Sequence, residues 1–145
     1  MLYFDTSYLA RLYLEDHGFQ TVRELAVTDS IATARHGRLE TVAAFHRALR
    51  EGRLSSNEFH QLENQFIFDC ERGGIHILAN TGATYLKTEN AFSHAPASTF
   101  LRAADALHLA CATENGFTEI YSNDRHFLTA APLFSLNGVN VIPIA

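Results

Sequence analysis

Four acidic residues, far apart along the chain, stand where a carboxylate could take part in chemistry. Asp5 follows the apolar run Met1–Phe4, and Asp124 comes just after Glu119–Ser122. Both segments have the composition of short β-strands. Because ligands of open α/β sheets bind beyond the carboxyl ends of the strands, we expect Asp5 and Asp124 to meet at one sheet edge. Asp is also a favoured helix N-cap, and either residue could serve in that way alone.

Asp105 is predicted to lie in the middle of a helix over Thr99–Glu114. Its neighbours four residues away are Leu101 and Leu109, so its carboxylate is expected along an apolar stripe. Burying an unpaired charge is very costly, which favours a polar site at this position. An ion pair with Arg102, three residues earlier, is the alternative.

Glu40 lies near the start of a predicted helix over Leu39–Glu51. An acidic residue is common there because the helix dipole favours it. Glu40 is therefore assigned to the site only because the other three carboxylates are present.

Four carboxylates without an accompanying cluster of His and Cys suit a hard cation. The eight histidines form no HxH or HExxH arrangement. Mg²⁺ or Mn²⁺ prefers oxygen ligands and is commonly held by carboxylates together with substrate phosphate. Such an ion can activate a water molecule and stabilise charge on a phosphoryl group. The predicted chemistry is phosphodiester hydrolysis.

Other residues near the acidic positions have less specific signals. His108 and His126 could orient a substrate, although a packing or surface role is the default. Arg102 and Arg125 could contact phosphate or serve as ion-pair partners. Three aromatic residues are predicted to belong to the core: Phe66, Phe68 and Phe100.

The elements that must position these residues alternate between strand and helix. Apolar runs predict strands over 1–4, 30–34, 75–78, 119–122 and 139–144. Helical spacing predicts helices over 8–14, 18–27, 39–51, 81–93 and 99–114. A capping box at Ser55 predicts the start of a further helix that extends to about Cys70, and a short helix is predicted within 124–133. This order predicts an α/β fold with a central, mainly parallel sheet between helices, as one domain over 1–145.

Composition narrows the class of protein further. The chain has 145 residues, 11 basic and 16 acidic, with a formal net charge of −5, which argues mildly against tight non-specific binding to nucleic acid. Ten of the basic residues are Arg, which suits bidentate phosphate contacts. No apolar stretch is long enough to span a bilayer, no secretory signal is evident, and Cys70 and Cys111 form no CxxC unit. We expect a cytoplasmic protein.

Four segments resemble PIN-domain proteins, in particular the VapC-like toxin ribonucleases of type II toxin–antitoxin pairs. They are LYFDTSYLARLYLED, RLETVAAFHRAL, LRAADALHLACA and IYSNDRHF, and they occur in the family's order from residue 2 to 127. The family's acidic positions fall on Asp5, Glu40, Asp105 and Asp124. One departure is Arg35-His36-Gly37, which replaces the Ser/Thr-rich approach to the helix that carries the glutamate.

The resemblance implies a three-layer PIN-like fold that binds Mg²⁺ or Mn²⁺ and cleaves RNA. It also implies a homodimer and inhibition by a small cognate antitoxin. The family's polar groups that orient carboxylates or bound water match Thr6, Ser7, Ser122 and Asn123.

Several alternatives stay open at this stage. A HAD-type phosphatase would need a second Asp where Ser7 stands, and a receiver domain would need a late Lys, whereas the only lysine is Lys87. A stand-alone RNA-processing nuclease and a catalytically inert PIN-fold binding module also fit the pattern.

Overall fold

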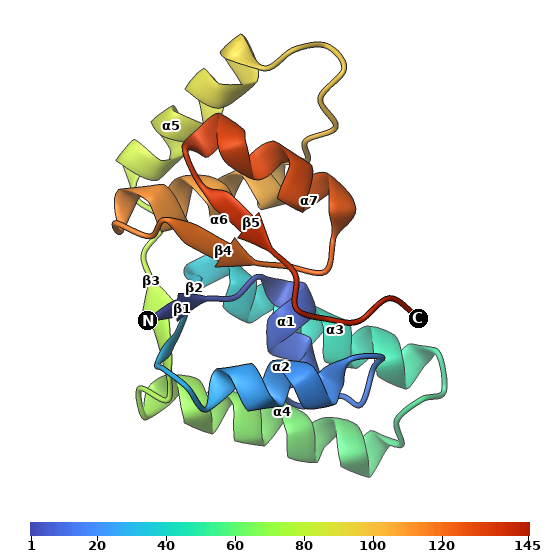
Figure 1. Ribbon diagram of the computed structural model, residues 1–145. Coiled ribbons are helices and arrows are strands. Elements are labelled where there is room, and N and C mark those ends of the chain that lie inside the picture. Colours follow the sequence, from blue (N-terminus) through green and yellow to red (C-terminus); the bar gives the residue numbers. More distant parts are fainter.

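Five short parallel strands form the centre of the structure, a computed structural model that describes residues 1–145 (Figure 1). One sheet pairs β1, β2 and β3, and a second pairs β4 with β5. A parallel bridge between Phe4 and Tyr121 links β1 to β4, so the order across the molecule is β3-β2-β1-β4-β5. The bounds are β1 Leu2–Tyr3, β2 Ile31–Ala34, β3 Ile75–Leu78, β4 Glu119–Tyr121 and β5 Asn137–Val139.

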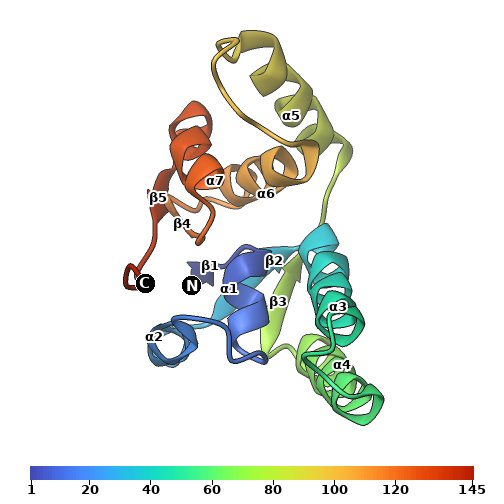
Figure 2. The same ribbon diagram turned by 90° about the vertical axis from the view of Figure 1, so that its right-hand side faces the viewer.

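Helices cover both faces of the strands, and Figure 2 shows the two groups on opposite sides. On one side lie α1 Thr6–Arg11, α2 Phe19–Ala26, α3 Arg35–Arg50 and α4 Ser56–Glu71. On the other lie α5 Gly82–His94, α6 Ala103–Glu114, α7 Arg125–Ala130 and a 3₁₀ turn over Ala131–Phe134. The predicted three-layer α/β fold with a parallel sheet is confirmed.

Two separate apolar clusters hold these layers together. Successive side chains of a strand point to opposite faces, so the adjacent residues Tyr3 and Phe4 enter different clusters. Phe4 packs with Phe45 and Phe66 from α3 and α4, whereas Tyr3 packs with residues of α6 and α7. The chain is thus anchored on both faces immediately before Asp5.

The boundaries of several predicted elements are wrong. The last strand is Asn137–Val139 rather than 139–144, and α6 begins at Ala103 rather than Thr99. Helix α3 begins at Arg35 rather than Leu39, and α1 spans Thr6–Arg11 rather than 8–14. Arg102 has an extended backbone and is the N-cap of α6, so Asp105 lies in the first turn and not in the middle of the helix. The capping box at Ser55 is confirmed by reciprocal bonds with Glu58. No helix is both long and apolar enough to cross a membrane.

Candidate active site

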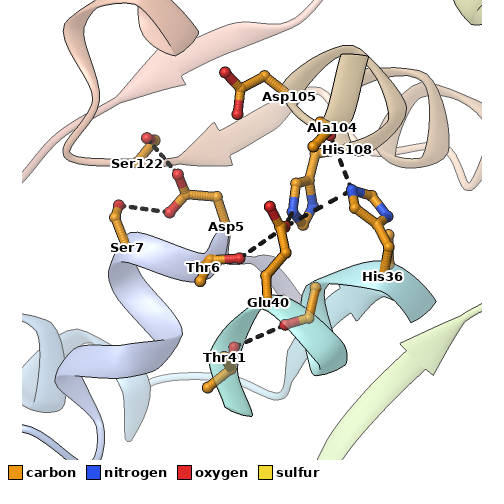
Figure 3. Close-up of polar contacts among 12 residues, drawn as sticks. Asp5, Thr6, Ser7, His36, Glu40, Thr41, Ala104, Asp105, His108 and Ser122 are labelled. Carbon is orange, nitrogen blue, oxygen red and sulfur yellow. Dashed lines mark hydrogen bonds and ion pairs between the residues drawn. The ribbon is translucent and has the colours of Figure 1, made fainter. Parts of the chain in front are cut away.

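All four predicted carboxylates line one cleft of about 550 Å³. Asp5 follows β1 and Asp124 follows β4, so the adjacent parallel strands bring both to the same sheet edge, as expected. Glu40 comes from the second turn of α3 and Asp105 from the first turn of α6. Four elements that are remote in sequence therefore place acidic side chains around one opening. Figure 3 shows three of them, Asp5, Glu40 and Asp105.

Asp5 is the most buried of the four, with 6% of its surface exposed, and it forms no ion pair. Its Oδ1 accepts hydrogen bonds from the Ser7 hydroxyl (2.6 Å) and the Tyr8 N–H (3.1 Å). Its Oδ2 accepts one from the Ser122 hydroxyl (2.6 Å). Burial raises the pKa of Asp5, and the bonds from Ser122 and Ser7 offset only part of that effect. The carboxylate is held in place by neutral donors, and no basic side chain pairs with it.

Two serines connect Asp5 to the β4–α7 loop. Ser7 Oγ accepts a hydrogen bond from the Asn123 N–H (2.9 Å) while it donates to Asp5. Ser122 Oγ accepts one from the Asp124 N–H (2.9 Å) while it donates to the other oxygen of Asp5. The predicted supporting role of these serines fits their contacts. The Asn123 side chain, in contrast, bonds to Asn140 and to none of the four acids.

We expect Ser122→Ala to destabilise the fold by about 1–3 kcal/mol, because it leaves a buried carboxylate oxygen without its donor. Denaturant unfolding of the metal-free protein measures this change. Ser93→Ala is a matched control, since the Ser93 hydroxyl is exposed and bonds only to the Glu89 carbonyl. Equal stability of the two variants would contradict the proposed support of Asp5.

Arg102 bridges two of the acids, and the ion-pair alternative for Asp105 is thus present in the structure. Its Nε donates to Asp105 Oδ2 (2.9 Å), and its terminal nitrogen donates to Asp124 Oδ2 (2.7 Å). Asp124 also caps α7 by accepting from the N–H groups of His126 and Phe127. Asp105 does not lie on the predicted apolar stripe, because Leu101 precedes the helix. More than half of the Arg102 side chain is exposed, so the pairs are solvent-screened.

Glu40 ends a chain of buried hydrogen bonds that begins on β1. Its Oε1 accepts from Thr6 Oγ1 (2.9 Å) and contacts His108 Nε2 at 2.7 Å. The other ring nitrogen of His108 lies 2.7 Å from the Tyr3 hydroxyl, which accepts from the Ala34 N–H. Burial alone would raise the pKa of Glu40, but the bonds from His108 and Thr6 leave it below its usual value. Glu40 is therefore held ionised.

A second histidine, His36, lies beside these hydrogen bonds with its ring tilted against that of His108. Its ring centroid lies 4.1 Å from that of His108. His36 Nε2 contacts the Ala104 carbonyl oxygen (2.8 Å), and Nδ1 contacts Asn80 Nδ2 (3.0 Å). Burial and the neighbouring His108 lower the pKa of His36, which favours the neutral ring.

Gly37 allows this close packing, because a Cβ atom there would lie 2.5 Å from Thr33 Oγ1 and 2.8 Å from His108 Cε1. We expect Gly37→Ala to cost about 1–3 kcal/mol in unfolding free energy through overpacking. Gly82→Ala is the matched control, since a Cβ atom there would meet nothing within 4 Å and the backbone is helical. Thermal unfolding of both variants checks the contrast, and a neutral Gly37→Ala would contradict it.

The oxygen atoms of the four acids are not close enough together to enclose one ion. Among sets of three or more His, Cys, Asp and Glu residues, only His36, Glu40 and His108 have ligand atoms that all lie within 4.8 Å of one another. An open acidic cleft nevertheless fits a hydrated Mg²⁺ or Mn²⁺, which keeps several waters and needs only one or two carboxylates plus phosphate. The uncompensated charge of buried Asp5 is consistent with such an ion.

Sequence reasoning missed part of this arrangement. Tyr3 and His36 were not predicted to take part, and the pairing of Arg102 with Asp124 was not foreseen. A signal for His108 existed, because it lies about one helical turn after Asp105 and shares its face. The core assignment holds for Phe66 but is wrong for Phe68 and Phe100, each 53% exposed.

A family comparison and two solved structures agree with this fold. The PIN domain family model matches residues 2–132, and the chain therefore belongs to the PIN domain family. VapC20 of Mycobacterium tuberculosis, described as a sarcin-ricin loop cleaving toxin, is 17% identical with a TM-score of 0.71, over 90% of this chain and 95% of its own. FitAB, solved bound to an IR36 DNA fragment, is 12% identical with a TM-score of 0.72. The match covers 100% of this chain and 98% of the FitAB chain. No curated protein matches the sequence significantly.

Proposed function

We propose that this protein is a metal-dependent endoribonuclease, acting as the toxin of a type II toxin–antitoxin pair. The observation that carries the proposal is the convergence of Asp5, Glu40, Asp105 and Asp124 on one cleft, with Asp5 buried and without a cationic partner. Membership of the PIN domain family and the similarity in fold to VapC20, an RNA-cleaving toxin, support it.

The acidic side chains would hold Mg²⁺ or Mn²⁺. When bound, such an ion supplies a water of lowered pKa and stabilises charge on the phosphate. Asp5 is fixed for this task by Ser7 and Ser122, and Glu40 by Thr6 and His108. These bonds restrict the carboxylates to one orientation before any ligand arrives.

Arg102 is suited to bind the RNA backbone at the rim of the cleft. Its guanidinium is always protonated, largely exposed, and matched to the geometry of phosphate. Phe100 lies beside it with an exposed ring, 5.9 Å from the guanidinium carbon, and its centroid is 4.3 Å from that of His126. Exposed aromatic rings next to basic groups stack with unpaired bases, which favours single-stranded or loop RNA.

The nuclease is tested with the isolated, tag-free chain and a single-stranded RNA substrate. We expect cleavage with Mg²⁺ or Mn²⁺ and none with EDTA, leaving a 5′-phosphate product. Asp105→Asn should be slower by at least about 100-fold, because it removes a proposed metal ligand. Glu89→Gln on exposed α5 is the control and should cleave normally.

Cleavage that persists unchanged in EDTA and in Asp105→Asn would exclude the proposed chemistry. A complete lack of cleavage by the folded chain with either metal would favour the inert binding module instead. A stand-alone processing nuclease would cleave RNA but have no inhibitor.

The partner proposal has its own test. We propose a small antitoxin whose arginine approaches the acidic cleft, which suits the net charge of −5. Co-expression with the product of the adjacent reading frame should yield a complex with suppressed nuclease activity. Full nuclease activity in the presence of the adjacent gene product would contradict the antitoxin proposal.

We also propose that the chain forms a homodimer. Light scattering of the isolated protein measures its mass in solution and so tests this.

A further inference from the structure

A compact set of nitrogen and oxygen ligands lies beside the acidic cleft. His36 and Glu40 are one turn apart on α3, and His108 reaches them from α6. Glu40 Oε1 lies 2.7 Å from His108 Nε2 and 3.8 Å from His36 Nε2. Figure 3 shows both rings directed toward the glutamate. No other set of such residues in the chain is as close.

Each ring is also held through its second nitrogen by a neutral group. His108 Nδ1 contacts the Tyr3 hydroxyl, and His36 Nδ1 contacts the Asn80 amide. Histidines that bind metals are usually held in this way, with the remote N–H donated to an oxygen atom. The arrangement therefore resembles a ligand set with its supporting groups already in place.

Two unpartnered atoms lie at the far ends of these contacts. Thr33 Oγ1 and Asn80 Oδ1 are the only buried side-chain polar atoms without a hydrogen bond. Thr33 lies close enough to the Tyr3 phenol to affect its pKa, and Asn80 is the partner of His36. Buried polar atoms without a hydrogen bond are rare in folded proteins, because each one lowers the stability of the fold.

A second pair of tautomers is compatible with these contacts. If each ring carries its proton on Nδ1, His36 can donate to Asn80 Oδ1 after a flip of the amide, whose O and N atoms are nearly alike in shape. His108 can then donate to the Tyr3 oxygen, which frees the phenolic proton for another acceptor. Both Nε2 atoms are left without protons, facing the ionised Glu40.

Only a cation makes this second arrangement favourable. Two bare nitrogens and a carboxylate repel one another, because all three present lone pairs. Protonating both rings would relieve this repulsion, but two imidazolium rings with centroids 4.1 Å apart would repel each other. A single divalent ion bound by all three groups avoids both costs.

We propose that His36 Nε2, His108 Nε2 and Glu40 Oε1 form a binding site for a borderline transition metal of the Zn²⁺ class. Two imidazoles and a carboxylate suit Zn²⁺, Co²⁺ or Ni²⁺, whereas the all-carboxylate cleft suits harder ions. The Ala104 carbonyl oxygen, 2.8 Å from His36 Nε2, or a water molecule supplies a fourth ligand. Because Glu40 also lines the cleft, an ion at this site would compete for one ligand of the proposed nuclease.

Co²⁺ is the probe for the test, because tetrahedral coordination by imidazole gives visible absorption that Mg²⁺ cannot produce. Tag-free protein is titrated with Co²⁺ in excess Mg²⁺. We expect saturation at one equivalent, loss of the bands on addition of Zn²⁺, and a higher melting temperature with Zn²⁺. His36→Gln should weaken Co²⁺ binding by at least about 100-fold, because it removes a ligand. Tyr3→Phe should weaken it by about 10-fold, because it removes the hydroxyl that holds the His108 ring.

Matched variants separate this site from the acidic cleft. Asp5→Asn and His46→Gln, the latter an exposed histidine on the same helix, should keep the cobalt bands. Circular dichroism verifies that each variant is folded. Bands that persist at unchanged affinity in folded His36→Gln, or that vanish in Asp5→Asn, would overturn the proposal, as would their absence from the wild type. The readout needs no RNA, so it is independent of the nuclease test.

Discussion

Asp5→Asn is expected to remove nuclease activity and at the same time to stabilise the metal-free protein. The activity should fall by at least about 100-fold, because the amide replaces a proposed metal ligand. The stability gain follows from burial, since Asp5 is 6% exposed and has no ion pair. Asn retains an oxygen that accepts from Tyr8 and Ser7, and its amide can donate to the Ser122 hydroxyl.

The effect of pH has a definite sign. Because burial raises the pKa of Asp5 in the folded state, the folded protein binds more protons than the unfolded chain just above the ordinary carboxyl pKa. Stability contributed by this group is therefore lost as pH rises through that window to the raised value. Asp5→Asn cannot ionise there and should lack this loss.

Denaturant unfolding in EDTA, from about pH 4 to about pH 8, measures the difference, which should be largest at neutral pH. Adding Mg²⁺ should raise the stability of the wild type more than that of the variant. Asp29→Asn is a control of opposite sign, because hydrogen bonds from the amino terminus and Ser30 lower the pKa of that exposed carboxylate. A metal-free Asp5→Asn less stable than the wild type at neutral pH would contradict the explanation.

The helices and strands were predictable from the spacing of apolar residues wherever tertiary packing did not override that local signal. The last strand shows where this failed. Residues 139–144 are apolar enough to suggest a strand, but Ile142 inserts into the cluster around α1, and the N–H of Val141 bonds to the Tyr8 hydroxyl instead of a strand. The segment that pairs contains Gly138, where a Cβ would come within 2.9 Å of Leu128. Such close approach to α7 is a tertiary requirement that strand propensity does not register.

The candidate site was predictable where strand order alone determines proximity. Asp5 and Asp124 follow adjacent parallel strands, so their placement at one edge required only the correct order of elements. The contacts of His108 with Tyr3 and Glu40 could not be predicted, because they span 105 and 68 residues and depend on how α3 and α6 pack. The departure at Arg35-His36-Gly37 was visible in the sequence, but the contact of the His36 ring with that of His108 was not, since it too depends on the packing of α3 and α6.

Arg102→Ala is expected to affect metal binding and RNA binding in opposite directions. In the free protein Arg102 pairs with both Asp105 and Asp124, and these bonds must be given up when an ion or phosphate takes their place. Exposed ion pairs contribute up to about 1 kcal/mol each. Removing both pairs, worth up to about 2 kcal/mol together, should therefore tighten Mg²⁺ or Mn²⁺ binding by up to about 30-fold, since about 1.4 kcal/mol corresponds to a factor of ten.

RNA affinity should fall in the same variant, because a bidentate phosphate contact is lost, and the salt dependence of binding should decrease by about one unit of slope. RNA binding is measured in the cleavage-deficient Asp5→Asn background, and metal binding by calorimetry with Arg102→Ala alone. Arg125→Ala is the matched control: Arg125 is exposed and forms no ion pair, so metal affinity should not change. Weaker metal binding in Arg102→Ala would mean that the guanidinium supports the acidic cleft instead of competing for it.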